Sequence, residues 1–234
     1  MQLTQNEQAP SHEGNDDDFR LLGQKIASCQ SIWTQVWHGA AAGRPSAHLM
    51  ALVQDEHRCN FDLWHEEDRA RAPGATDAQI ATVKRAIDRL NQQRNDLIEK
   101  LDEHILSALE AHKVHTSPGM PSNSETPGSV IDRLSILSLK VYHMREQTER
   151  LDASKEHVLK SRERLRVLTR QHEDLTLALQ HLLADLFEAR KQMKIYRQFK
   201  MYNDPDANPE IYNAKTKTAK TLHHRGTENT ENSD

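Results

Sequence analysis

A long heptad-type series near the C-terminal end places the strongest constraint on how this chain can fold. Between residues 165 and 196, apolar or aromatic side chains recur at alternating spacings of three and four, with one histidine among them. The members are Leu165, Leu168, His172, Leu175, Leu179, Leu182, Leu186, Ala189, Met193 and Tyr196. This spacing keeps one stripe of a helix facing its neighbours. We therefore expect a continuous helix over residues 154–201, about 70 Å long at about 1.5 Å per residue.

Further helices are indicated at residues 19–38, 46–71 and 76–112, and from Thr126 onward. Thr76 with Gln79 matches a capping box, and Thr126 followed by Pro127 is typical of an N-cap and first helical position. The helix that begins there carries apolar residues on more than one face, so we expect it to be buried on several sides.

The predicted fold class is all-α: an elongated antiparallel bundle of about five helices, the last of them very long. One bundle domain is expected to span residues 19–212. The polar, acidic residues 1–18 and the polar residues 213–234 offer little to bury, so both are expected to be disordered tails.

Composition excludes several classes of function. The formal net charge of −4 argues against broad nucleic-acid binding, which needs a basic surface. The sequence has no apolar run long enough for a membrane span, and its start lacks the features of a secretory signal. Cys29 and Cys59 form neither a metal-ligand pattern nor a disulfide framework. A cytoplasmic location is the expectation.

Two rows of polar side chains at helical spacing are the main candidates for a site. The first row, in the stretch CNFDLWHEEDRAR, contains Asn60, Trp64, Glu67, Asp68 and Arg71. The second contains Asp88, Asn91, Gln92, Asn95, Glu99 and Asp102. If the two helices are antiparallel neighbours, the rows could face each other and line an acidic pocket. Alternatively, they form solvated surface pairs, such as Glu67 with Arg71 and Asp88 with Gln92.

Metal-ligand patterns are weak, and no metal ligand or cofactor is assigned. Asp62-x-x-His65 has a spacing used by di-iron bundles, but no second Glu-x-x-His copy accompanies it. His181 and Asp185 lie one turn apart, as do the candidate pairs around His65, which leaves a mononuclear site open. His172, within the apolar series, is interpreted as a structural residue that sets register.

A basic and aromatic cluster follows in KIYRQFKMYNDP. Lys194, Arg197 and Lys200 alternate with aromatic residues at the expected end of the long helix. Cations at a helix C-terminus are favoured by the helix dipole. The same cluster could hold a phosphate or a sugar.

Four stretches together carry a family resemblance: NFDLWHEEDRAR, IDRLNQQRNDLIEKLD, SETPGSVIDRLSILSLKVYHM and YRQFKMYNDPDANP. Over residues 20–212 the chain resembles the bacterial family catalogued as domain of unknown function 4254. The resemblance implies a soluble, helical bacterial protein, and it supplies no catalytic role. Its pattern overlaps the two polar rows and adds Arg94, Asp132, Lys140 and His143. It also implies a glycan-related ligand, through association with glycosyltransferases in surface-polysaccharide loci.

The leading hypothesis is a polar, acidic site within the bundle that binds a small phosphorylated or sugar-type ligand. Glu67, Asp68 and Glu99 are the candidate catalytic carboxylates, since burial beside other acids raises the pKa of a carboxyl group. Arg71, Arg94 and the cluster at residues 194–200 would meet phosphate. Whether the protein is an enzyme is left open. The alternatives are an adaptor, or homo-oligomer, that pairs through the 165–196 seam, and a metal-dependent helical-bundle enzyme.

Overall fold

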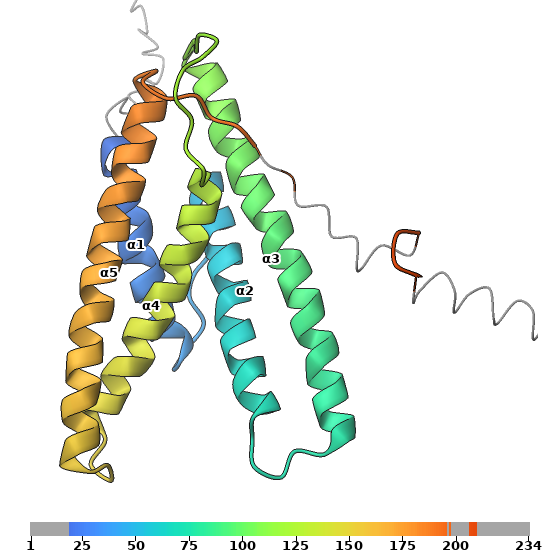
Figure 1. Cartoon of the computed structure of the whole chain (residues 1–234), viewed down its shortest axis with the longest axis vertical. Helices are drawn as coiled ribbons and strands as arrows, with labels where there is room; N and C mark the ends of the chain where they lie inside the picture. Colours follow the sequence, from blue (N-terminus) through green and yellow to red (C-terminus); the bar gives the residue numbers. More distant parts are fainter. Residues whose placement is uncertain (1–18, 196, 198–205, 210–234) are drawn as a thin grey trace, which may run out of the picture. The chain divides into compact units, whose positions relative to one another are not determined.

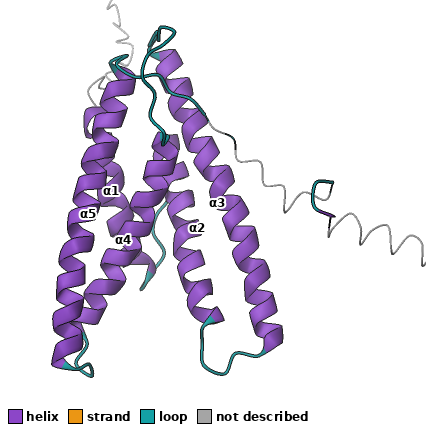
Figure 2. Ribbon diagram, in the orientation of Figure 1, coloured by secondary structure: helices purple, strands orange, loops and turns teal. Residues whose placement is uncertain are grey.

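The computed structural model describes residues 19–195, 197 and 206–209. Contacts divide the chain into two units, residues 1–196 and 197–234, and every named helix belongs to the first. Figures 1 and 2 show these helices: α1 (Phe19–Trp37), α2 (His48–Ala70), α3 (Asp77–Ala111), α4 (Pro127–Glu149) and α5 (Lys155–Phe187). The described residues contain no strand, only an isolated bridge between Ser122 and Gln192. The predicted all-α class is confirmed, whereas the predicted tails lie outside the described residues.

Local capping signals explain where three of the helices begin. The Thr76 side chain accepts from the Gln79 backbone N–H, and the Gln79 side chain accepts from the Thr76 backbone, so the predicted capping box is present. Thr126 caps α4 with Pro127 at its first position, and Ser154 caps α5. Each cap satisfies a backbone donor that the helix itself leaves open.

Helix α4 is the centre of the bundle. It packs against each of the other four helices, and Figure 1 shows it between α3 and α5. Its fully buried side chains include Ile131 and Leu134, which join residues of α1, α2, α3 and α5 in one apolar core. The predicted burial of this helix on several sides is confirmed. No helix among the described residues is long and apolar enough to cross a membrane.

Helices α3 and α4 are in close contact at Gly128. The Gly128 backbone N–H donates to Asp102 Oδ1 at 2.7 Å, so a buried carboxylate of α3 satisfies the N-terminus of α4. A Cβ atom at residue 128 would lie 2.6 Å from the Ile98 carbonyl oxygen and 2.9 Å from Asp102 Oδ1. Because a backbone oxygen cannot rotate away, only a residue without a side chain fits.

We expect Gly128→Ala to lower the free energy of unfolding by about 1–3 kcal/mol, the usual cost of overpacking. The steric cost has to outweigh the preference of about 1 kcal/mol that alanine has over glycine in a helix. Urea unfolding is the measurement. Gly39→Ala is the matched control, because nothing lies within 4 Å of a Cβ there. A Gly128→Ala protein as stable as the wild type would contradict this close contact.

The predicted continuous helix to residue 201 is wrong, because α5 ends at Phe187. Ala189 adopts a left-handed backbone conformation (φ 54°), and the Asp185 carboxylate binds both Arg190 and Lys191 of the following turn. Gln192 then donates its backbone N–H to the Pro121 carbonyl at 2.9 Å. Contacts with the loop before α4 thus redirect the chain, although apolar spacing continues through Met193. At about 1.5 Å per residue, the 33 residues of α5 span about 50 Å.

The heptad seam of α5 is used unevenly. Leu179, Leu182 and Leu186 are buried in the core of the same chain, whereas Leu165 and Leu168 are only half-buried. Pairing between copies through residues 165–196 remains a prediction. The three buried leucines of this seam already pack within their own chain.

Candidate functional site

The polar row of α2 divides between the interior and the solvent. Asn60 is buried, and Trp64 is half-buried. Glu67 forms an ion pair of 2.7 Å with Arg71, and 45% and 69% of the two side chains are exposed. Asp68 is exposed. Glu67 and Arg71 therefore form the solvated surface pair that was the alternative hypothesis to a buried acidic pocket.

The polar row of α3 does not face the α2 row as a single surface. Asp88 is exposed and pairs with Lys84 rather than with Gln92, which donates to Asp96 at 2.8 Å. Three further members are half-buried: Asn91, Asn95 and Glu99. Glu67, Asp68 and Glu99 thus form no buried carboxylate cluster, so the physical reason given for their catalytic role is absent.

A different polar network is buried where α2, α3 and α4 meet. Arg94 of α3 donates through Nε and Nη2 to both carboxylate oxygens of Asp132, at 2.5 and 2.6 Å. Asn60 Nδ2 lies 3.0 Å from Asp132 Oδ1 and 2.5 Å from Oε1 of Glu56, which is fully buried. Asn60, Arg94 and Asp132 were predicted site residues, and the structure brings them together. Sequence reasoning missed Glu56.

The pKa values of the two buried acids of this network shift in opposite directions. Burial raises the pKa of Glu56 well above its usual value, and the nearby Asp132 charge and a hydrogen bond to Asp132 raise it further. Burial also opposes ionisation of Asp132, but hydrogen bonds from Arg94, Glu56 and Asn60 outweigh it and lower its pKa. These opposite shifts favour a proton on Glu56 and a negative charge on Asp132, which is ion-paired with Arg94.

A chain of hydrogen bonds with a defined direction leads from this network to α1. Thr34 Oγ1 donates its single proton to the Gln30 carbonyl, so it accepts from His57 Nε2 at 2.9 Å. His57 Nδ1 then accepts from Ser135 Oγ at 2.7 Å. Burial lowers the pKa of His57 to about 3, which keeps the ring neutral as this pattern requires. Stability contributed by the neutral ring is lost as pH falls from about 6.5 towards 3.

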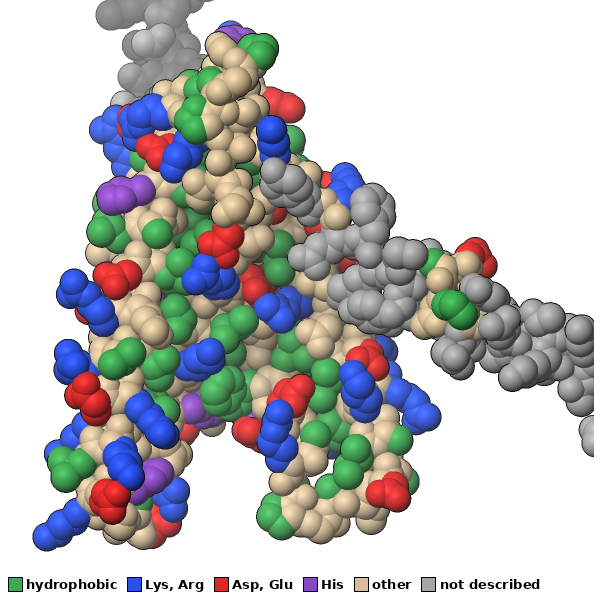
Figure 3. Space-filling model, in the orientation of Figure 1, with side chains coloured by type: hydrophobic (Ala, Val, Ile, Leu, Met, Phe, Trp, Pro, Cys, Tyr) green, Lys and Arg blue, Asp and Glu red, His purple; other side chains and the backbone are tan. Residues whose placement is uncertain are grey.

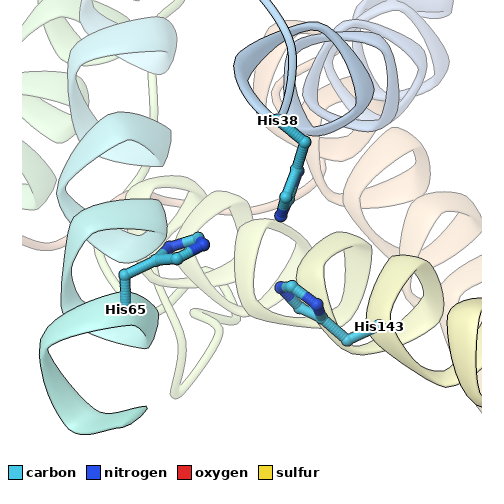
Figure 4. A group of neighbouring side chains, drawn as sticks. All are labelled: His38, His65 and His143. Carbon is cyan, nitrogen blue, oxygen red and sulfur yellow. The ribbon is translucent and has the colours of Figure 1, made fainter. Parts of the chain in front are cut away.

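Three histidines converge near Thr34, where this chain of hydrogen bonds ends. His38 directly follows α1, His65 lies on α2 and His143 lies on α4. One ring nitrogen from each lies within 4.8 Å of the other two, and Figure 4 shows the rings turned toward one shared space. Among the described residues, no other group of three or more potential metal ligands meets this distance. Of the three, only His143 was a predicted site residue.

Hydrogen bonds fix which nitrogen each ring presents. His38 Nδ1 bonds the Thr34 carbonyl at 2.7 Å, and His65 Nδ1 bonds the Phe61 carbonyl at 2.8 Å. His143 Nδ1 lies 2.8 Å from a Glu146 carboxylate oxygen. Since these oxygens only accept, each Nδ1 carries the proton and each Nε2 presents a lone pair. Nε2 of His38 and of His143 are buried and have no hydrogen-bond partner among the described residues.

This arrangement has the features of a three-histidine metal site. Metal-bound histidines usually donate their second ring nitrogen to a carbonyl or carboxylate oxygen, which fixes the tautomer. Burial lowers the pKa of His143, and the neighbouring His38 and His65 lower it further, although Glu146 acts in the opposite sense. In a tetrahedral site with bonds near 2.05 Å, nitrogens lie roughly 3.3 Å apart. The three nitrogens, within 4.8 Å of one another, would have to move closer to reach that spacing.

Aromatic rings hold the cluster in place. Tyr142 stacks on His38 with ring centroids 4.1 Å apart, and Trp64 stacks on His143 at 4.6 Å with an interplanar angle of 10°. Phe61 packs against His65 at 4.4 Å. The rings are thereby restrained on their faces as well as at Nδ1.

A groove of about 720 Å³ adjoins the cluster between α2, α4 and α5. Figure 3 shows the surface hollowed between the lower halves of these helices. Four predicted site residues line it: Trp64, Asp68, Lys140 and His143. His143 therefore belongs both to the histidine cluster and to the groove.

Of the predicted basic cluster at residues 194–200, the two cations that the structure describes are not on a helix. Lys194 is exposed and lies beyond the end of α5, and Arg197 is exposed as well. Lys200 lies outside the described residues. The dipole argument for these cations does not apply to Lys194, because the helix that supported it ends at Phe187.

Of the earlier metal-ligand candidates, His65 belongs to the histidine cluster, whereas Asp62 and Asp185 do not. Asp62 pairs with Arg58 at 2.9 Å, and Asp185 pairs with Arg190 and Lys191. His38 was not identified at all. Nothing in the sequence around His38 marks it as a ligand, because it is a single histidine just after a helix. Its partners lie on other helices, and the sequence does not reveal how those helices pack.

A sequence model for a protein family of unknown function, DUF4254, matches residues 50–195, more than half of the chain. The protein belongs to the DUF4254 family. The match covers α2 to α5 and the turn that follows, and so includes His65 and His143 but not His38. No curated protein and no solved structure gives a significant match. The DUF4254 family is described only as one of unknown function, so the function has to be argued from the site.

Proposed function

We propose that this DUF4254 protein is a metal-dependent enzyme with a divalent transition-metal ion, in the first instance Zn²⁺, bound by Nε2 of His38, His65 and His143. The convergence of three imidazole lone pairs, two of them buried without a partner, supports the proposal. Lone pairs repel one another when nothing lies between them, and buried acceptors without donors are costly. A cation at their centre removes both costs.

The donor set favours zinc chemistry that retains an open coordination position. Imidazole nitrogen suits Zn²⁺, and catalytic zinc sites commonly use three protein ligands with the fourth position left for water or substrate. Bound there, the ion acts as a Lewis acid and lowers the pKa of water to about 7, which suits hydrolysis. The adjacent groove offers a place for the substrate. A cytoplasmic location and a glycan-related ligand, both expected from the sequence, remain parts of the proposal.

Metal binding by the untagged protein, purified without chelator, is the decisive measurement. We expect one equivalent of Zn²⁺, and a Co²⁺-substituted form with visible absorption typical of a tetrahedral site. At a free metal concentration about 1,000 times Kd, binding should raise the free energy of unfolding by about 4 kcal/mol. His65→Ala and His143→Ala should each weaken binding by more than the roughly 10- to 100-fold that loss of an outer-shell contact costs.

A second histidine pair supplies the matched control. His48 and His104 have ring centroids 5.2 Å apart on α2 and α3, away from the cluster. His48→Ala should therefore leave Zn²⁺ affinity unchanged. Absence of stoichiometric binding, or an equal loss in His48→Ala, would remove the basis for the proposal. Urea unfolding of the metal-free variants separates loss of ligands from loss of fold.

A further inference from the structure

We infer that the groove beside the histidine cluster binds a small amphiphilic anion, namely an apolar chain or ring system that ends in a phosphate or carboxylate. The inference rests on the proposed function, since His143 would connect the groove to the metal centre. The groove volume of about 720 Å³ lies within the range of small-molecule sites.

The lining of the groove is mostly apolar. Met144 of α4 and Val167 and Leu168 of α5 line the groove together with Trp64, and Val167 remains 43% exposed. A ligand that covers these side chains removes apolar surface from water, which favours binding. A bare sugar phosphate would leave most of this surface unused. A glycan-related ligand, as expected from the sequence, would therefore need an apolar part as well.

Two cations on facing helices supply the anion contact. Lys140 of α4 and Arg164 of α5 line the groove, and neither has an ion-pair or hydrogen-bond partner in the described part of the chain. Of the two acids in the lining, Glu163 is already paired with Arg166 at 2.8 Å. Among the described residues, the groove lining therefore carries two positive charges without a partner, and Asp68 is the one acid left to oppose them. A phosphate or carboxylate matches that balance, because charge-assisted hydrogen bonds are the strong ones.

Isothermal titration of metal-free and Zn²⁺-loaded protein tests the inference, with decyl phosphate below its micellar concentration as the probe. Glucose 1-phosphate and octyl glucoside supply the anion alone and the chain alone. We expect decyl phosphate to bind more tightly than either, in both forms of the protein. Lys140→Glu/Arg164→Glu should raise its Kd at least about tenfold and leave octyl glucoside binding unchanged.

The control variant Arg145→Glu/Arg162→Glu makes the same charge change on the same helices outside the groove, and a change in Kd below about twofold is expected. Equal weakening in this control, or glucose 1-phosphate binding as tightly as decyl phosphate, would overturn the inference. So would binding to anionic vesicles that the groove variant abolishes, because the surface would then serve a membrane. Zn²⁺ stoichiometry is measured on each variant. Zn²⁺ binding without decyl phosphate binding would overturn only the inference about the groove. Decyl phosphate binding without Zn²⁺ binding would overturn only the proposed metal centre.

Discussion

Arg94→Met should lower the free energy of unfolding by about 3–5 kcal/mol at pH 7, the usual cost of removing one partner from a buried ion pair. Arg94 donates to both oxygens of Asp132, of whose side chain only 8% is exposed. Without the guanidinium, the Asp132 carboxylate would keep its contacts with Asn60 and Glu56 but would have no compensating charge. Methionine fills most of the volume of the arginine stem, so the loss reports on charge rather than on a cavity. Urea unfolding gives the difference.

Two further variants make this expectation specific. Lys84→Met removes the exposed pair with Asp88 on the same helix and should cost less than about 1 kcal/mol. Adding Asp132→Asn to Arg94→Met removes the stranded charge and should recover more than half of the loss, since asparagine still accepts from Asn60. An Arg94→Met protein that loses less than about 1 kcal/mol would show that Asp132 is solvated or protonated in the folded state.

The parts of the fold that the sequence predicts well are those decided locally. The Thr76–Gln79 capping box and the Thr126–Pro127 start are each encoded within four residues, and both were found where expected. The end of α5 is decided at long range. Apolar spacing continues through Met193, but Gln192 contacts the loop at residues 120–122, and a left-handed residue at 189 redirects the chain. A helical period cannot report a contact made by a distant loop.

The same distinction separates what could be predicted of the site from what could not. Helical spacing singled out Asn60, the family resemblance added Arg94 and Asp132, and the three side chains do meet. The direction in which each row turns depends on the crossing of α2, α3 and α4, so Glu67 could not be distinguished from Asn60 by spacing. The histidine cluster is harder still. His38 follows α1 and His143 lies on α4, and only the packing of α1 against α4 brings them together.

Glu56→Gln should make the protein more stable than the wild type above about pH 5, by a margin that grows with pH. The folded-state pKa of Glu56 is raised, mainly by burial, whereas an unfolded glutamate titrates near 4.3. Between those two values the unfolded wild-type chain releases a proton that the folded protein retains. Wild-type stability therefore falls with rising pH by up to about 1.4 kcal/mol per unit. Glutamine keeps an acceptor for Asn60 and a donor for Asp132, so it preserves the network without the titration.

The comparison between the two proteins isolates Glu56, because both retain His57, whose pKa of about 3 makes stability fall on the acid side. Urea unfolding from pH 4 to pH 8 should give equal stabilities near pH 4 and a widening advantage for the variant above it. Glu125→Gln breaks an exposed pair with Arg133 and should change stability by less than about 1 kcal/mol throughout. A constant difference between Glu56→Gln and the wild type across this range would mean that Glu56 is ionised in the folded state. The buried network would then hold two carboxylates against a single arginine.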